Sequence, residues 1–289
     1  MGGAPLARAV GLLALWTLGV VATAGPVAAS ERGAAGGTSG VFKHAVKVSE
    51  SKGSAEVSFV VGLAAPGLGS VPIVKVVGEQ TFRAPLRAHF VLTIPSGSGN
   101  GETSLHEILV GNTVYLRIGG AWYEQSTQAA LGQVGLSGSL SSSDPTQILQ
   151  VLEARGAVVT KVGSRTLAGV ATTEYRAVIS VAQAEQHLGS TGISATPAAL
   201  KEFSQLSSSP TYPVTVWLDS DSRIRQLKIE LPLSHAALAN FGLQDAPSGV
   251  SLSIALTFSH YGVKVVAPAP PASEVHPVPT TTTTTAASG

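Results

Sequence analysis

The chain has 289 residues, a formal net charge of +1, 12% charged residues, 44% hydrophobic residues and no cysteine. Without cysteine there is no disulfide framework, thiolate metal site or cysteine nucleophile, and the balanced charge argues against a nucleic-acid partner. The high apolar content and low charge predict a globular chain and argue against a disordered one.

The first 29 residues are typical of an export signal. Arg8 precedes an uncharged stretch from Ala9 to Ser30 with an apolar core at Val10–Val21, and small-residue motifs suitable for signal peptidase follow. The alternative is an uncleaved anchor, but glycine and proline interrupt the stretch before about 20 apolar residues accumulate. We expect a signal peptide at residues 1–29 and a flexible lead-in at 30–40. Because the chain has no cysteine to carry a lipid, we expect an exported, extracytoplasmic protein that is not lipid-anchored.

Apolar and polar residues alternate through most of the middle of the chain. The alternating segments are residues 56–63, 86–94, 105–110, 113–118, 174–181, 212–218, 225–231 and 250–260. Such a period of two predicts an antiparallel sheet with one dry face and one wet face.

Helical patterns are fewer. A short helix is predicted at Val41–Ser49 and another after Asp144-Pro145, where Asp is a suitable N-cap and Pro suits the first helical position. Residues 182–188 and 197–206 complete the set. The sequence therefore predicts an α+β fold, a curved antiparallel sheet with a few helices packed on one face. We expect one domain at residues 41–266 and a disordered Pro- and Thr-rich tail at 267–289.

No arrangement of residues predicts catalysis. The seven histidines lack metal-ligand spacing, and no Gly-x-Ser-x-Gly elbow follows a strand. Asp219 and Asp221 flank a predicted hairpin turn, which favours a turn over a catalytic pair or a calcium loop. Trp122 and Tyr123 are interpreted as packing at the end of a hairpin. We therefore expect no enzyme activity, no metal and no cofactor.

The dry face of the sheet is the remaining candidate site. Periodicity alone leaves two interpretations open, a filled core and an apolar cavity that binds a ligand. If the face lines a cavity, we expect its wall to include eleven side chains, which are Phe59, Phe90, Leu92, Leu116, Ile179, Val216, Leu227, Ile229, Leu252, Ile254 and Leu256.

Four sequence segments, taken in their order along the chain, resemble those of one protein family. They are VGNTVYLRIGGAWYEQ at 110–125, DPTQILQVLEARGAVVTKVGSRTLAGVATTEYRAVISV at 144–181, PVTVWLDSDSRIRQLKIEL at 213–231 and TFSHYGVKVVAPAPPASEV at 257–275. Their order is similar to that in the actinobacterial lipid-carrier lipoproteins of the LppX, LprA, LprF and LprG type, within the LolA/LolB-like half-barrel group. The lipidated cysteine of that family is absent here.

The resemblance implies a half-barrel whose dry face holds the acyl chains of a lipid or lipoglycan. It also implies a non-enzymatic carrier in the cell envelope or secreted, with transient membrane contact, and we expect a monomer. An alternative function is an extracytoplasmic sensor or regulatory protein of the same fold that binds a partner protein.

Overall fold

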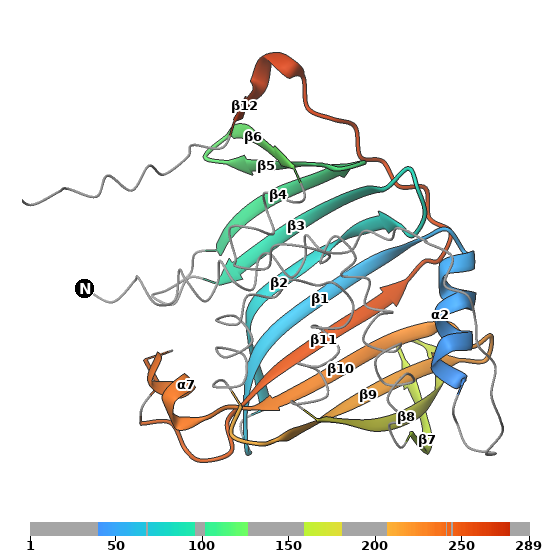
Figure 1. Cartoon of the computed structure of the whole chain (residues 1–289), viewed down its shortest axis with the longest axis vertical. Helices are drawn as coiled ribbons and strands as arrows, with labels where there is room; N and C mark the ends of the chain where they lie inside the picture. The colour runs from blue at the N-terminus through green and yellow to red at the C-terminus, as the bar shows by residue number, and fades with distance from the viewer. Residues whose placement is uncertain are drawn as a thin grey trace, which may run out of the picture.

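The computed structural model describes residues 40–67, 69–95, 102–126, 159–180, 207–240, 242–243 and 245–277. Strands dominate this part of the chain (Figure 1). They are β1 (Ser54–Ala65), β2 (Gly69–Thr81), β3 (Arg87–Pro95), β4 (Glu102–Val110), β5 (Thr113–Ile118), β6 (Ala121–Ser126), β7 (Thr160–Leu167), β8 (Val170–Ser180), β9 (Thr211–Asp219), β10 (Ile224–Pro232), β11 (Ser251–Ser259) and β12 (Val275–Pro277). Two α-helices accompany them, α2 (Val41–Ser51) and α7 (His235–Asn240), with a 3₁₀ turn at Ala272–Glu274.

The described strands form one sheet in the order β12-β6-β5-β4-β3-β2-β1-β11-β10-β9-β8-β7. Neighbouring strands are antiparallel except β12 and β6, which are parallel. β12 and β7 lie at opposite edges, so the sheet curves but does not close (Figure 1). This open, curved antiparallel sheet confirms the predicted fold class. Every alternating segment of the sequence analysis corresponds to a strand, and these strands are β1, β3, β4, β5, β8, β9, β10 and β11.

Strand β11 lies in the middle of the sheet, between β1 and β10. Its pairing with β1 extends from Glu56 opposite Ser259 to Ala64 opposite Ser251. This contact joins strands that are nearly 200 positions apart in the chain and so unites the two halves of the sheet. Antiparallel pairing with matched apolar faces explains why large apolar residues recur at every second position in both segments.

The predicted helix at Val41–Ser49 is confirmed as α2, which extends to Ser51. Its apolar stripe, Phe42, Ala45 and Val46, is buried. The Phe42 ring meets the Tyr175 ring of β8 edge to face at 6.2 Å between centroids, and the Ile224 backbone N–H donates to the Ser49 hydroxyl at 3.0 Å. α2 therefore packs against the β8–β10 end of the sheet (Figure 1). The helices predicted at residues 144–155, 182–188 and 197–206 lie outside the described residues.

The predicted tail begins differently from our expectation. Residues 267–277 continue along the sheet, and Val275, His276 and Pro277 pair with Trp122, Tyr123 and Glu124 of β6. The edge of β6 offers unpaired backbone groups, and a short extended segment satisfies them regardless of its Pro-rich composition. Residues 278–289 lie outside the described part of the chain.

Gly78 of β2 packs closely against β3. A Cβ atom at this position would lie 2.6 Å from Cδ1 of Phe90 and would also collide with the carbonyl oxygen of His89. We expect Gly78→Ala to lower the free energy of unfolding by about 1–3 kcal/mol, because the backbone cannot yield as a flexible side chain would. Urea unfolding measures this change.

Gly163 of β7 is the matched control, because a Cβ there meets no atom within 4 Å. Gly163→Ala should leave the free energy of unfolding unchanged or slightly higher. Equal effects of the two substitutions would contradict the close approach of β2 and β3.

Candidate functional site

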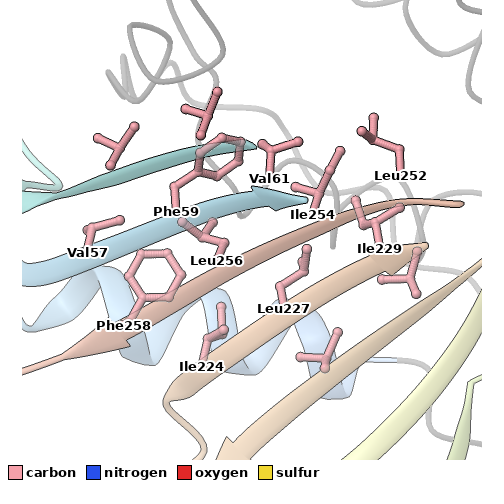
Figure 2. Packing of buried hydrophobic residues seen from close by; sticks show 14 of the residues in the cluster. Val57, Phe59, Val61, Ile224, Leu227, Ile229, Leu252, Ile254, Leu256 and Phe258 are labelled. Carbon is pink, nitrogen blue, oxygen red and sulfur yellow. The ribbon is translucent and has the colours of Figure 1, made fainter. Parts of the chain in front are cut away.

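One face of the sheet carries continuous rows of apolar side chains, which we call the apolar face. Directly paired residues of antiparallel strands point to the same side, so the register defines each row. The longest row crosses eight strands and consists of Tyr175, Val216, Leu227, Leu256, Phe59, Val76, Leu92 and Leu105. A neighbouring row consists of Ala177, Val214, Ile229, Ile254, Val61 and Val74. Figure 2 shows labelled members from β1, β10 and β11 projecting from the same side of the ribbon.

Apart from Ile179, whose side chain lies outside the described part of the structure, the register brings the predicted wall residues onto the apolar face. Nine of them are less than a tenth exposed, namely Phe59, Phe90, Leu92, Val216, Leu227, Ile229, Leu252, Ile254 and Leu256. Leu116 is half-buried and packs against this cluster. The backbone of Ile179 pairs with Tyr212 of β9. The placement of these side chains on one face agrees with the alternation in the sequence. Their role as a ligand-binding wall stays a prediction.

An open hollow of about 460 Å³ lies where α2 meets the apolar face. Val41, Tyr175 and Leu218 form its apolar lining, and its polar lining comes from Gly40, His44, Thr173, Asp219 and Ser222. A volume of this size is within the range of small-molecule pockets. Tyr175 and Leu218 lie in two of the alternating segments, 174–181 and 212–218, but the sequence analysis did not assign them to a site, because nothing in the alternation shows where α2 docks.

Asp219 organises the rim of this hollow. Its side chain is 1% exposed, and its Oδ1 accepts hydrogen bonds from the backbone N–H groups of Asp221 and Arg223 at 3.0 and 2.9 Å. Its Oδ2 accepts from the Nε–H groups of Arg223 and Arg225 at 2.8 and 2.7 Å. Burial acts to raise the pKa of Asp219, but these hydrogen bonds outweigh it and lower the pKa. The predicted turn is confirmed, and Asp219 holds it together.

Glu107 interrupts the apolar face with a carboxyl group. It lies on β4, directly between Phe90 of β3 and Leu116 of β5, and is 7% exposed. Burial raises the pKa of Glu107 from 4.5 to about 8, so this carboxyl is mostly protonated at neutral pH. The sequence analysis missed it, although Glu at the centre of the alternation Leu105-x-Glu107-x-Leu109 was a visible signal.

Gln80 of β2 is the second polar side chain buried on this face. It pairs with Ala55 of β1 and Ala88 of β3 and is 1% exposed. Neither atom of its side-chain amide has a hydrogen-bond partner. Buried polar groups without partners are rare and call for an explanation.

Metal-binding and membrane-spanning features are not evident in the described residues. No group of three or more histidine, aspartate or glutamate side chains converges there as a metal site would. Across the same residues, no helix has the length and hydropathy needed to cross a bilayer.

Two histidine contacts lie away from the apolar face. His89 and His106 stack on the opposite face of the sheet with ring centroids 6.2 Å apart. The His260 ring contacts the Glu56 carboxylate at 2.6 Å.

Solved structures with a related arrangement include two mycobacterial proteins. LprF from Mycobacterium bovis is 13% identical, with a TM-score of 0.48, covering 81% of this chain and 96% of LprF. The lipoprotein LppX from Mycobacterium tuberculosis is 16% identical, with a TM-score of 0.48, covering 79% of this chain and 96% of LppX. In fold, this chain resembles LprF and LppX.

A more distant similarity is to a LolA superfamily protein from Nitrosomonas europaea. It is 10% identical with a TM-score of 0.26, covering 78% of this chain and 93% of that protein. No protein-family model matches the sequence, and no curated protein matches it. At these identities the similarities concern the fold alone.

The buried carboxyl of Glu107 makes stability depend on pH. Between pH 4.5 and 8 the unfolded chain has lost this proton while the folded chain keeps it, so raising the pH favours unfolding. Relative to Glu107→Gln, the wild type should lose about 1.4 kcal/mol of unfolding free energy per pH unit across this window. Urea unfolding from pH 4 to pH 9 measures the difference.

Glu230→Gln is the control for this series, because Glu230 is 43% exposed and pairs with Lys228 at the surface. Its pH profile should run close to that of the wild type. Parallel profiles for wild type and Glu107→Gln would contradict the burial of a protonated carboxyl.

Proposed function

We propose that this protein is an exported, non-enzymatic lipid-binding carrier that holds acyl chains of a lipid or lipoglycan against the apolar face. The observation that carries the proposal is the continuity of that face. One row of apolar side chains extends from Tyr175 of β8 to Leu105 of β4 without a charged residue. The predicted export signal supports an extracytoplasmic location.

The dimensions of the face suit acyl chains. From β8 to β4 the row crosses seven strand spacings, or about 34 Å along the sheet at roughly 4.8 Å per strand. The hydrocarbon core of a bilayer is about 30 Å thick and contains two acyl chains end to end. The apolar face is therefore long enough for two chains in line.

The energetics support the same cargo. Burial of an acyl chain contributes about 0.8 kcal/mol per CH₂ group, or roughly 12 kcal/mol gross for a 16-carbon chain. The loss of translational freedom on association and the ordering of the acyl chain oppose binding by several kcal/mol. The remainder is enough for retention of a lipid that has almost no solubility in water.

Native mass spectrometry of the protein purified from its own host, beginning at Ser30 after signal cleavage, tests the proposal. We expect a bound species of lipid mass near one per chain, which organic extraction removes and identifies. A protein without lipid that takes up none from a supplied mixture would contradict the carrier function. That result would favour the alternative, a regulatory protein that binds a partner protein.

Leu63 allows a test of the binding face without burying a charge in the core. It is half-buried at the end of β1 and pairs with Leu252, one of the predicted wall residues. We expect Leu63→Asp to weaken binding of methyl palmitate about tenfold, the effect of losing contact with roughly two CH₂ groups. Displacement of a bound fluorescent fatty acid measures the affinity.

Ala64 is the matched control, because it is also half-buried but points to the opposite face of the same strand. Ala64→Asp should bind methyl palmitate as the wild type does. Equal loss in both variants would mean that the substitutions act through folding, and no loss in either would contradict binding on the apolar face. Circular dichroism confirms that each variant is folded.

A further inference from the structure

Two polar side chains in the apolar face, those of Gln80 and Glu107, have no hydrogen-bond partner among the described residues. Both amide atoms of Gln80 are buried and unpartnered. For the carboxyl group of Glu107, the described part of the chain supplies neither a hydrogen bond nor an ion pair, and desolvation alone perturbs its pKa. Leaving such groups unsatisfied costs about 1–3 kcal/mol each. A core of leucine and valine would not carry this cost, so a role other than packing explains them better.

The two side chains lie close together on the same face. Gln80 on β2 and Glu107 on β4 flank β3, where their partners are Ala88 and Phe90. Two strand spacings and a two-residue offset separate their backbones by roughly 12 Å. Both side chains are long and lie on the same side of the sheet, so one small polar group between them is within reach of both.

The residues between them leave Glu107 without a cover from β3. Ala88 carries only a methyl group, and the Phe90 ring leans toward β2, since its Cδ1 lies 2.6 Å from where a Cβ of Gly78 would be. The ring thus tilts away from β4, on which Glu107 lies. Gly78 makes this tilt possible, because any other residue there would displace the ring.

We propose that Glu107 and Gln80 form a polar subsite within the apolar face that binds the hydroxyl groups of a glycerol- or sugar-bearing lipid. A protonated carboxyl donates one hydrogen bond and accepts others, and an amide does both. This combination matches neutral hydroxyl groups, which also donate and accept. The subsite rests on the proposed function, because the acyl chains bring the hydroxyl groups to it.

Charge argues against an anionic headgroup at this position. On β1 to β6, the apolar face carries no lysine or arginine among the described residues, since Lys75, Arg87 and Arg117 all point to the opposite face by the register. A phosphate would thus be buried beside a carboxyl group without a cation to neutralise it, which is strongly unfavourable. A neutral polyol avoids this cost.

The experiment compares two neutral probes with the same acyl chain, 1-monopalmitoylglycerol and methyl palmitate. The quantity measured is the ratio of their affinities for the full mature protein, from displacement of a bound fluorescent fatty acid. We expect the wild type to prefer 1-monopalmitoylglycerol by about tenfold or more, the effect of one to two hydrogen bonds to buried groups. Glu107→Leu and Gln80→Leu should each reduce this preference several-fold, and Glu107→Gln should keep most of it.

Glu230→Leu is the control, since Glu230 lies on the opposite face and is 43% exposed. It should leave the preference unchanged. A wild type that binds both probes equally, or a preference that survives both leucine variants, overturns the subsite and leaves the carrier function standing. A wild type that binds neither probe overturns both. Tighter binding of palmitylamine than of 1-monopalmitoylglycerol would overturn the assignment to hydroxyl groups in favour of a cationic headgroup.

Discussion

Cross-strand register between β1 and β11 is the contact on which the rest of this structure depends. It aligns Val57, Phe59 and Val61 with Phe258, Leu256 and Ile254, and every row of the apolar face extends outward from it. A shift of one residue would turn all these side chains to the other face. Because the large apolar side chains of both strands gather on one face, a pairing shifted by one residue would expose one of the two sets to solvent. This constraint acts across a separation of nearly 200 positions in the chain.

The register also explains why buried polar side chains in the apolar face point to a functional site. Gln80 and Glu107 lie in positions where the pairing leaves no alternative orientation, since turning either outward would turn Val76 and Val74 or Leu105 and Leu109 outward with it. Their burial is thus a consequence of the sheet and not of a flexible loop. Residues that break a local rule at a fixed position without compensation are the expected signature of a functional site.

Most of the sheet was predictable because alternation and burial coincide in its central strands. The alternating segments did not include β2, β6, β7 or β12. β2 and β7 were missed for opposite physical reasons. In β2 valines occupy both faces, and Val71 and Val77 are exposed, so the period of two is hidden. In β7 nearly every residue is exposed at the sheet edge, so no apolar face exists to produce a pattern. β12 follows from the free edge of β6 and not from its own composition.

Of the candidate site, only the apolar side chains could be predicted from the sequence. Alternation grouped the eleven predicted wall residues on one face, because burial on one side of a sheet selects apolar side chains directly. Glu107 breaks the alternation visibly, but the significance of Glu107 and of Gln80 depends on which groups the neighbouring strands bring to them, and alternation does not describe this. The hollow beside α2 depends on the docking of a helix, which periodicity does not describe.

The unsatisfied groups and the apolar rows have complementary effects on the free energy of ligand binding. The apolar rows favour any acyl chain in proportion to buried area and so distinguish poorly between lipids. A hydrogen bond made only when a ligand arrives lowers the energy of the bound state without stabilising the empty one, and it is lost with a ligand that lacks the matching group. A few buried polar atoms in an extended apolar wall therefore provide selectivity, while the wall itself provides most of the affinity.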